Sequence, residues 1–353
     1  MELLLVLLVL IAVVLALVVL GRLTGVIKGL NPTTSDSDLE PGKANRINGA
    51  MFIIVGVLGF IAIAWSYLHS EKFYLPEASS VHGRRTDDLF WFSMGLLTIP
   101  FVLVNAVLFF FAWKYQHKSG KRATFYPENH RLEMVWTIIP AVVMAVLVLT
   151  GWKAWSDITS EAPEDAEVIE ITGKQFGWIA RYGGADDNKL GNYDYRLIDA
   201  QNEVGIDFTD ENSFDDFTNP SELHIPANRP VLLKIRARDV LHSVFIPHMR
   251  VKMDAVPGMP TKFWFVADKT TAEMRAETGN PEFKYEIACT EVCGQGHFGM
   301  KIVLVVDDEE SYQKWISEQQ PFLKTYPEYL DKVPANLRAK AAKYVGEQTA
   351  SAE

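Results

Sequence analysis

The sequence predicts a membrane-anchored protein whose soluble part is an all-β Greek-key sandwich. Apolar stretches dominate the first 153 residues, and short runs of strand-forming residues dominate the remainder. Both cysteines of the chain fall in one short segment of that second part, beside a histidine and a methionine. A length of 353 residues leaves room for both parts.

Four apolar stretches are each long enough to cross a membrane. Residues 3–20 are apolar without a break, and residues 47–70, 89–113 and 134–152 contain no Asp, Glu, Lys or Arg. A hydrocarbon core of ~30 Å needs about 20 helical residues at ~1.5 Å each. The predicted membrane helices are residues 1–22, 47–70, 89–113 and 133–153, of which the last two form a hairpin.

The first of these helices could instead be a cleaved secretory signal. Its leading residues, Met1 and Glu2, carry no positive charge, and its apolar run is longer than the usual core of a signal peptide. These two features favour a retained helix.

The charges of the connecting loops predict the orientation of the helices. The loops after the first and third helices are rich in Lys and Arg, whereas residues 68–88 hold three basic residues and four acidic ones. Loops rich in positive charge stay in the cytoplasm. We therefore expect a chain in the bacterial cytoplasmic (inner) membrane, with both termini and the β-rich part on the periplasmic side.

The β-rich part is acidic. From Lys153 onward the chain has 22 basic and 34 acidic residues, a net charge of −12. Strand-like runs separated by Pro, Gly and Asn are typical of a Greek-key sandwich. These runs are residues 168–172, 176–182, 231–236, 262–267, 283–288 and 301–306. They predict a domain over residues 165–307, followed by a charged tail over 308–353.

Residues 289–300, C-T-E-V-C-G-Q-G-H-F-G-M, contain the chemistry of a metal site. Thiolates select copper or zinc, and a methionine thioether favours copper. The segment supplies one imidazole, so a second must come from elsewhere. His242, in D-V-L-H-S, is the best candidate and His248 its rival. Two cysteines outside the cytoplasm could also form a disulfide, but the histidine and methionine beside them favour a metal.

The motif C-x-E-x-C-G-x-x-H-x-x-M, preceded by D-V-x-H-S, resembles cytochrome c oxidase subunit II. The resemblance extends over roughly residues 89–307. It implies a cupredoxin-like fold for the β-sandwich and a dinuclear copper A centre. Such a subunit takes electrons from a c-type cytochrome and passes them to haem in subunit I, where oxygen is reduced to water and protons are pumped. The haems and copper B would belong to subunit I.

The resemblance also implies a ligand set. Cys289 and Cys293 would bridge the two coppers, and His242 and His297 would each bind one. The weak ligands would be the sulfur of Met300 and the backbone carbonyl of Glu291. The carboxylate of Glu291 would bind a magnesium ion shared with subunit I.

Three further positions are candidates for function. Glu133 matches a family glutamate that takes up protons for subunit I, although the helix dipole alone also favours an acid there. Phe176 stands where the family has an exposed tryptophan that receives electrons, and Trp178 is the second candidate. The loss of that indole favours a cytochrome held in a respiratory supercomplex over one that diffuses freely.

An acidic stretch, residues 183–221, interrupts the strand pattern and is longer than the usual family connection. The simpler interpretation is a solvated insertion on a tolerant loop. The alternative is a docking surface for a basic cytochrome.

Other functions are less consistent with the sequence. A quinol oxidase subunit II shares the helices and the fold but lacks the copper ligands. An extracytoplasmic copper carrier would need a single exchangeable copper, which the two thiolates and two histidines do not suggest. The chain has no C-x-x-C-H motif for covalent haem, so a fused cytochrome c is excluded.

Overall fold

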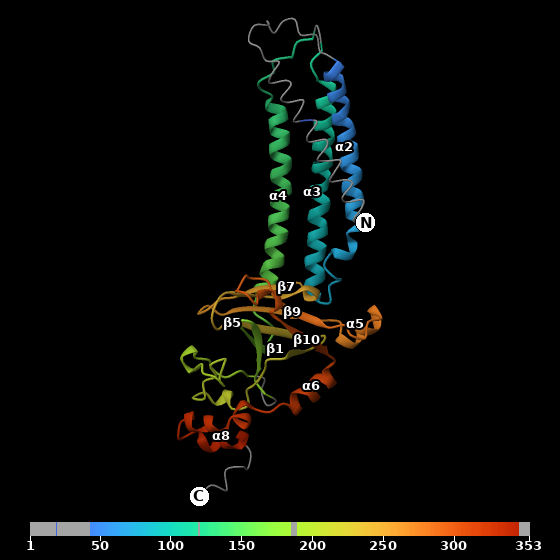
Figure 1. The fold of residues 1–353 in the computed structure, drawn as a ribbon. Helices are drawn as coiled ribbons and strands as arrows, with labels where there is room; N and C mark the ends of the chain where they lie inside the picture. The colour runs from blue at the N-terminus through green and yellow to red at the C-terminus, as the bar shows by residue number, and fades with distance from the viewer. Residues whose placement is uncertain (1–18, 20–42, 119–120, 185–188, 346–353) are drawn as a thin grey trace. The chain divides into compact units, whose positions relative to one another are not determined.

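The computed structural model describes residue 19 and residues 43–118, 121–184 and 189–345. These residues form two compact units, one within residues 1–69 and 100–128 and the other within residues 70–99 and 129–353. Three helices in the described part are long and apolar enough to span a membrane (Figure 1). They are α2 (Lys43–His69), α3 (Val81–Lys114) and α4 (His130–Thr159). The predicted helix over 1–22 lies outside the described residues, apart from residue 19.

All three helices begin before the apolar stretches that predicted them, and α3 and α4 also end after them. Apolar length sets the part that crosses the bilayer, whereas capping groups set where a helix begins. At α4 the side chain of Asn129 accepts a hydrogen bond from the backbone N–H of Leu132 at 3.1 Å. The helix therefore begins at His130, three residues before the predicted start.

In the first unit, α2 packs closely against the second half of α3. A Cβ atom at Gly56 would lie 2.7 Å from the ring of Phe109, so glycine permits this approach. The rings of Phe60 and Phe101 meet edge to face at 6.5 Å.

The second unit contains the predicted β-sandwich. Its two five-stranded sheets have the orders β3-β2-β1-β5-β8 and β4-β10-β9-β6-β7. Two pairs of non-sequential neighbours, β1 with β5 and β4 with β10, are parallel, whereas β5 with β8 and β6 with β9 are antiparallel. The strands are β1 (Glu167–Lys174), β2 (Gly177–Tyr182), β3 (Phe217–Asn219), β4 (Glu222–Pro226), β5 (Pro230–Ala237), β6 (His242–Ile246), β7 (Val251–Ala255), β8 (Thr261–Val266), β9 (Tyr285–Cys289) and β10 (Lys301–Asp307).

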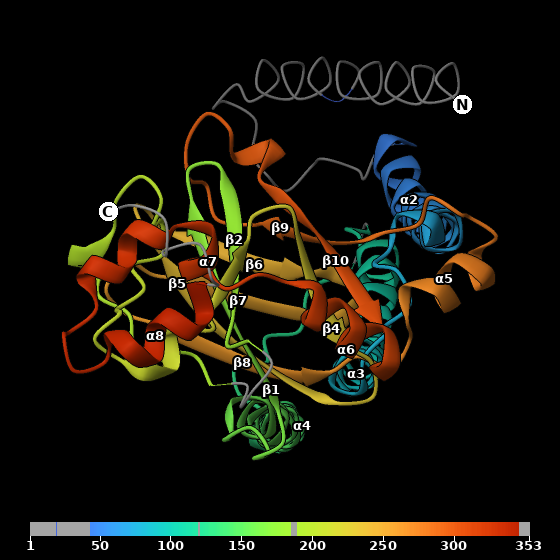
Figure 2. The same cartoon turned by 90° about the horizontal axis from the view of Figure 1, so that it is seen from below.

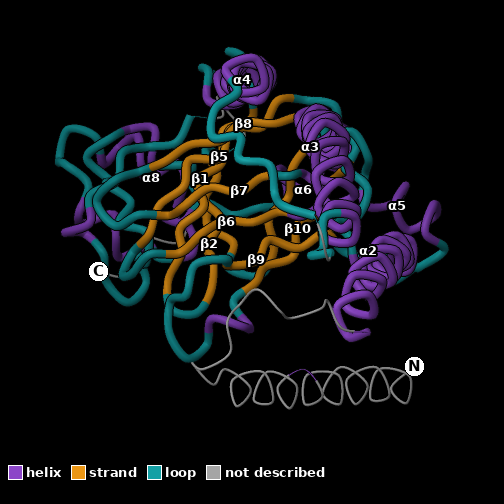
Figure 3. The backbone as a smooth tube through the Cα atoms, turned by 90° about the horizontal axis from the view of Figure 1, so that it is seen from above, coloured by secondary structure: helices purple, strands orange, loops and turns teal. Residues whose placement is uncertain are grey.

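Side chains from both sheets form one core, which includes Ile171 and Leu233 of one sheet and Val244 and Leu304 of the other. Figure 3 shows the strands gathered in a single body. The predicted fold class, membrane helices followed by a cupredoxin-like sandwich, is therefore confirmed. Four further helices follow β8 or β10: α5 (Thr271–Thr278), α6 (Glu309–Glu318), α7 (Phe322–Thr325) and α8 (Arg338–Val345).

The acidic stretch 183–221 is not a solvated loop. Its apolar side chains and those of the C-terminal tail share a second core, which also includes Ile179 of β2. Figure 2 shows α7 and α8 beside the loops of this stretch. Val204, Ile206 and Phe208 are buried and alternate with Gly205 and Asp207, so a period-two pattern was present in the sequence.

Several acids of this stretch are paired within the domain. Asp216 forms a buried ion pair with Arg181, and Glu211 pairs with Lys340 of the tail. Asp199 accepts hydrogen bonds from Tyr329 at 2.5 Å and from Lys332 at 2.9 Å. These acids connect the stretch to the domain and the tail, which leaves less charge to attract a partner.

Candidate metal centre

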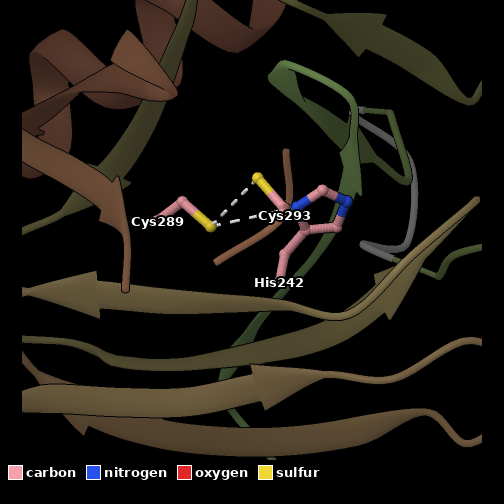
Figure 4. Close-up of side chains that lie close together, drawn as sticks. All are labelled: His242, Cys289 and Cys293. Atoms are coloured by element: carbon pink, nitrogen blue, oxygen red, sulfur yellow. Dashed lines mark hydrogen bonds between the residues drawn. The ribbon is translucent and has the colours of Figure 1, made fainter. Parts of the chain in front are cut away.

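Two strand ends and one loop bring the predicted ligands together. His242 begins β6 and Cys289 ends β9, and these strands are antiparallel neighbours. The backbone N–H of Cys289 donates to the carbonyl of Met300 at 3.0 Å, which closes the loop before β10 at its base. Figure 4 shows the side chains of His242, Cys289 and Cys293 around one common space.

The sulfur atoms of the two cysteines lie at the centre of this group. Sγ of Cys289 is 3.9 Å from Sγ of Cys293 and 3.9 Å from Nδ1 of His242. Sγ of Cys293 is 3.7 Å from Nδ1 of His297 and 3.7 Å from Sδ of Met300. Each histidine therefore faces a different sulfur.

These separations fit a metal and not a disulfide. Both cysteines are free, and their sulfurs are far beyond the ~2.05 Å of a disulfide. Two sulfurs that share a metal at ~2.3 Å lie at most ~4.6 Å apart, and a nitrogen and a sulfur that share one at most ~4.3 Å. All four separations satisfy these limits. His242, Cys289, Cys293 and Met300 are also buried, so water has little access.

Two residues that the sequence analysis did not single out hold the site in place. Asp239 accepts from Nε2 of His242 at 2.8 Å, which turns Nδ1 of that ring towards Cys289. Its second oxygen accepts from the backbone N–H of Gln175 at 2.7 Å, and the side chain of Gln175 donates to the carbonyl of Cys293 at 2.5 Å. The turn between β1 and β2 is thereby tied to both sides of the site.

The same turn places an aromatic ring over residues 289–300, which we call the ligand loop. A Cβ atom at Gly296 would lie 2.5 Å from Cγ of Phe176, so only a glycine admits this ring. Phe176 is 43% exposed. Trp178 is 2% exposed, and its ring packs edge to face on the ring of His242, with 5.9 Å between the centroids. Of the two aromatic candidates, Phe176 is the one that a partner protein can touch.

Comparisons with known proteins agree with this geometry. Residues 68–153 match the family model described as cytochrome c oxidase subunit II, transmembrane domain, and residues 167–306 match the periplasmic domain of the same subunit. The alternative cytochrome c oxidase subunit 2 of Bradyrhizobium diazoefficiens is 32% identical over 225 residues, which are 63% of this chain and 76% of that protein. The chain belongs to the cytochrome c oxidase subunit II family.

Two further relatives share less identity with this chain. Cytochrome c oxidase subunit 2 of Synechocystis is 26% identical over 294 residues, 78% of this chain and 84% of the relative. That of Cereibacter sphaeroides is 24% identical over 280 residues, 74% of this chain and 83% of the relative. The protein is thus a subunit of a haem-copper oxidase, an oxidoreductase complex.

Three other positions predicted for this subunit II have the following contacts in the structure. The carbonyl oxygen of Glu291 lies 3.2 Å from Sγ of Cys289, and the Glu291 side chain is exposed. Glu133 accepts from the backbone N–H of Asn129 at 3.3 Å, within the first turn of α4. His248 packs edge to face on Phe283 and Tyr285, away from the sulfur atoms.

The environment of the thiols affects how they bind a metal. Burial, together with the neighbouring Cys289, raises the pKa of the Cys293 thiol to about 11. Without metal this thiol keeps its proton at neutral pH. Copper must displace that proton, so binding should weaken as the pH falls.

Proposed function

We propose that this chain holds the copper A centre of the oxidase. Two thiolates and two imidazoles would bind the coppers, and a thioether and one backbone carbonyl would complete the site. When bound, this centre takes up and releases one electron at a time. The observation that carries the proposal is the chain of contacts between these groups in one buried site. The groups belong to His242, Cys289, Glu291, Cys293, His297 and Met300.

The protein residues keep the site rigid. His242 and Cys289 lie on paired strands, and Asp239 fixes the ring of His242. Gln175 holds the backbone of the ligand loop at Cys293. Rigid ligands change little when the charge of the site changes, and this lowers the cost of electron transfer.

The position of Phe176 supports a direction for the electrons. Its exposed ring covers the ligand loop, so we assign it as the contact for a c-type cytochrome on the periplasmic side. Electrons would then pass to haem in subunit I, where oxygen is reduced and protons are pumped. The haems and copper B would be held by subunit I.

Contacts near α3 support the predicted orientation. The backbone N–H of Ser79, in the segment before α3, donates to the carbonyl of His248 at 2.7 Å. That segment and the β-sandwich therefore lie on the same side of the membrane. Since the same segment is the least positive loop, both should be periplasmic in a bacterial inner membrane. With the helix proposed over 1–22, the chain would cross four times.

Two carboxylates are proposed to act at the boundary with subunit I. The exposed side chain of Glu291 is free to reach a magnesium ion there. Glu133, at the cytoplasmic start of α4, is proposed to take up protons. Its capping bond to Asn129 would also account for an acid at this place.

The test of copper A uses the full-length chain loaded with copper. We expect two coppers per chain and an electron paramagnetic resonance spectrum in which one electron is shared by two equivalent copper nuclei. A single exchangeable copper with the spectrum of one nucleus would instead support a copper carrier. Absence of bound copper would support the structural subunit of a quinol oxidase.

A further inference from the structure

Arg250 has an unusual backbone and an unusual side chain. Its φ angle is 55°, a left-handed conformation that favours glycine. Its side chain is only 8% exposed, although arginine is rarely buried without a partner. A residue that is disfavoured in both respects requires compensating contacts.

The guanidinium of Arg250 makes these contacts with the first turns of α3 and with the segment before that helix. Nε and Nη2 donate to the two carboxylate oxygens of Asp87 at 2.8 and 2.9 Å, which is the forked geometry that arginine prefers. Nη2 also donates to the carbonyl of Pro76 at 2.6 Å. Nη1 donates to the carbonyl of Pro247 at 2.5 Å. One side chain thereby joins the turn before β7 to residues 76–87.

Neighbouring bonds close the same junction. Oγ of Ser80 donates to the carbonyl of Met249 at 2.8 Å. The backbone N–H of Asp268 donates to the carbonyl of Ser79 at 3.1 Å, and the Asp268 carboxylate pairs with Arg84. Ser79 and Ser80 are almost fully buried. We call this junction, residues 76–87 with Arg250 and Asp268, the α3 clasp.

The α3 clasp is a second attachment of the β-sandwich to its membrane helices. The chain itself connects α4 to β1 through residues 160–166. A domain held at one connection can rock about it, whereas one that is also held at another helix cannot. Arg250 directly precedes β7, an edge strand of one sheet, and Asp268 follows β8, an edge strand of the other.

We propose that Arg250 is a positioning residue for electron transfer, acting through the α3 clasp. The inference rests on the proposed copper A function. The clasp holds the copper-binding domain in one position, so that the distance from the copper site to the haem of subunit I stays constant. Electron transfer becomes slower as the distance between donor and acceptor grows, so a domain that shifts away from subunit I should deliver electrons more slowly.

The test compares variants at two left-handed residues. Arg250→Gly removes the guanidinium and suits the local backbone, so that a loss cannot be ascribed to backbone strain. Asn228→Gly is the matched control, because Asn228 has a φ of 60° and lies outside the clasp. Arg250→Lys keeps the charge but not the fork. Asp87→Asn removes the carboxylate and leaves Arg250 in place.

The first measurement is made on the assembled oxidase. In Arg250→Gly and Asp87→Asn we expect an unchanged copper A spectrum and unchanged reduction of copper by the donor. Transfer from copper to haem should fall several-fold below the wild-type rate. Arg250→Lys should lie between these variants and the wild type, and Asn228→Gly should match the wild type. Wild-type transfer rates in both Arg250→Gly and Asp87→Asn would overturn the proposal.

The second measurement needs no copper. Hydrogen exchange of the backbone amides of Ser79 and Asp268 should accelerate in Arg250→Gly and not in Asn228→Gly. Unchanged exchange would mean that Arg250 does not hold the clasp, and would overturn the proposal. If the wild type bound no copper while exchange behaved as expected, the copper A assignment would fail and the clasp itself would stand.

Discussion

The carboxylate of Asp239 lies 2.8 Å from Nε2 of His242, on the side of the ring away from Cys289. This contact leaves Nδ1 free to bind metal and fixes the direction in which it points. The same carboxylate binds the backbone N–H of Gln175. One residue therefore orients a ligand and anchors the turn that bears Phe176.

Asp239→Asn should weaken copper binding by about 10- to 100-fold, the usual effect of losing such a second partner. Copper affinity would be measured by competition with a chelator. Asp194→Asn, at a partly exposed acid that pairs with Arg196 on the acidic stretch, serves as the control and should bind copper as the wild type does. Equal affinities in the two variants would show that Asp239 does not orient His242.

Cys293→Ser should abolish the dinuclear spectrum, because its sulfur faces Cys289, His297 and Met300. Met300→Leu should retain two coppers and mainly shift the reduction potential, since a weak axial ligand tunes a copper site more than it holds the metal. Copper content and the redox titration of each variant measure this. If Met300→Leu lost copper as completely as Cys293→Ser, the ranking of the ligands would be wrong.

The sequence predicted those parts of the fold and of the metal site that depend on local patterns of residues. Uninterrupted apolar length gave the three described helices, and the residue types of 289–300 gave four of the six contacting groups. His242 was supplied by its own short motif, and the carbonyl of Glu291 only by the resemblance to subunit II. The α3 clasp was not predictable in this way. Its partners Asp87 and Arg250 are 163 residues apart, and no local pattern pairs them.

The second core was missed for a different reason. The many Asp and Gly residues of 183–221 indicated a solvated loop, while the apolar partners of that stretch lie in the tail, beyond β10. Burial of Asp216 also depends on Arg181, which precedes the stretch. Charge composition describes a segment in isolation, whereas burial depends on what packs against it.

His224 contacts two carboxylates of the sandwich and one aromatic ring of the tail. Its ring stacks on Trp315 of α6 at 4.0 Å, with Nδ1 2.6 Å from Asp307 and Nε2 3.0 Å from Glu222. Burial alone would lower the pKa of His224, but the two carboxylates outweigh it and the pKa is raised. The folded state therefore holds this proton more tightly than the unfolded state does.

This difference predicts how stability depends on pH. The contribution of His224 should be complete below about pH 6.5, its usual unfolded value, and should be lost as the pH rises through the higher folded pKa. His224→Gln should lower the free energy of unfolding by ~1–3 kcal/mol at low pH, because buried acceptors lose a charged donor. Thermal unfolding across this pH range is the measurement. A wild type and variant that differ equally at every pH would exclude a titrating contact.

Glu133→Ala should slow oxygen consumption by the assembled oxidase and leave reduction of copper A by the donor unchanged. The change removes a proposed proton acceptor and touches no electron carrier. Glu133→Gln is the matched control, because it keeps the capping acceptor for Asn129 but cannot carry a proton at neutral pH. A slow Ala variant with a normal Gln variant would reduce Glu133 to a capping residue.

The charge of the soluble domain and the geometry around Phe176 give opposite expectations about how the donor cytochrome reaches this chain. The net charge of −12 beyond Lys153 would steer a basic, diffusing cytochrome, and its rate would then fall as the Debye length shrinks from ~30 Å at 0.01 M salt to ~8 Å at 0.15 M. However, several acids of 183–221 are paired internally, and Phe176 presents an apolar ring. We therefore expect a held donor, electron input in intact membranes that hardly depends on salt, and no acceleration by Phe176→Trp. Stopped-flow or flash-induced reduction of copper A across that salt range measures both. A steep fall with salt, together with faster oxidation of added cytochrome c by Phe176→Trp, would establish a diffusing donor instead.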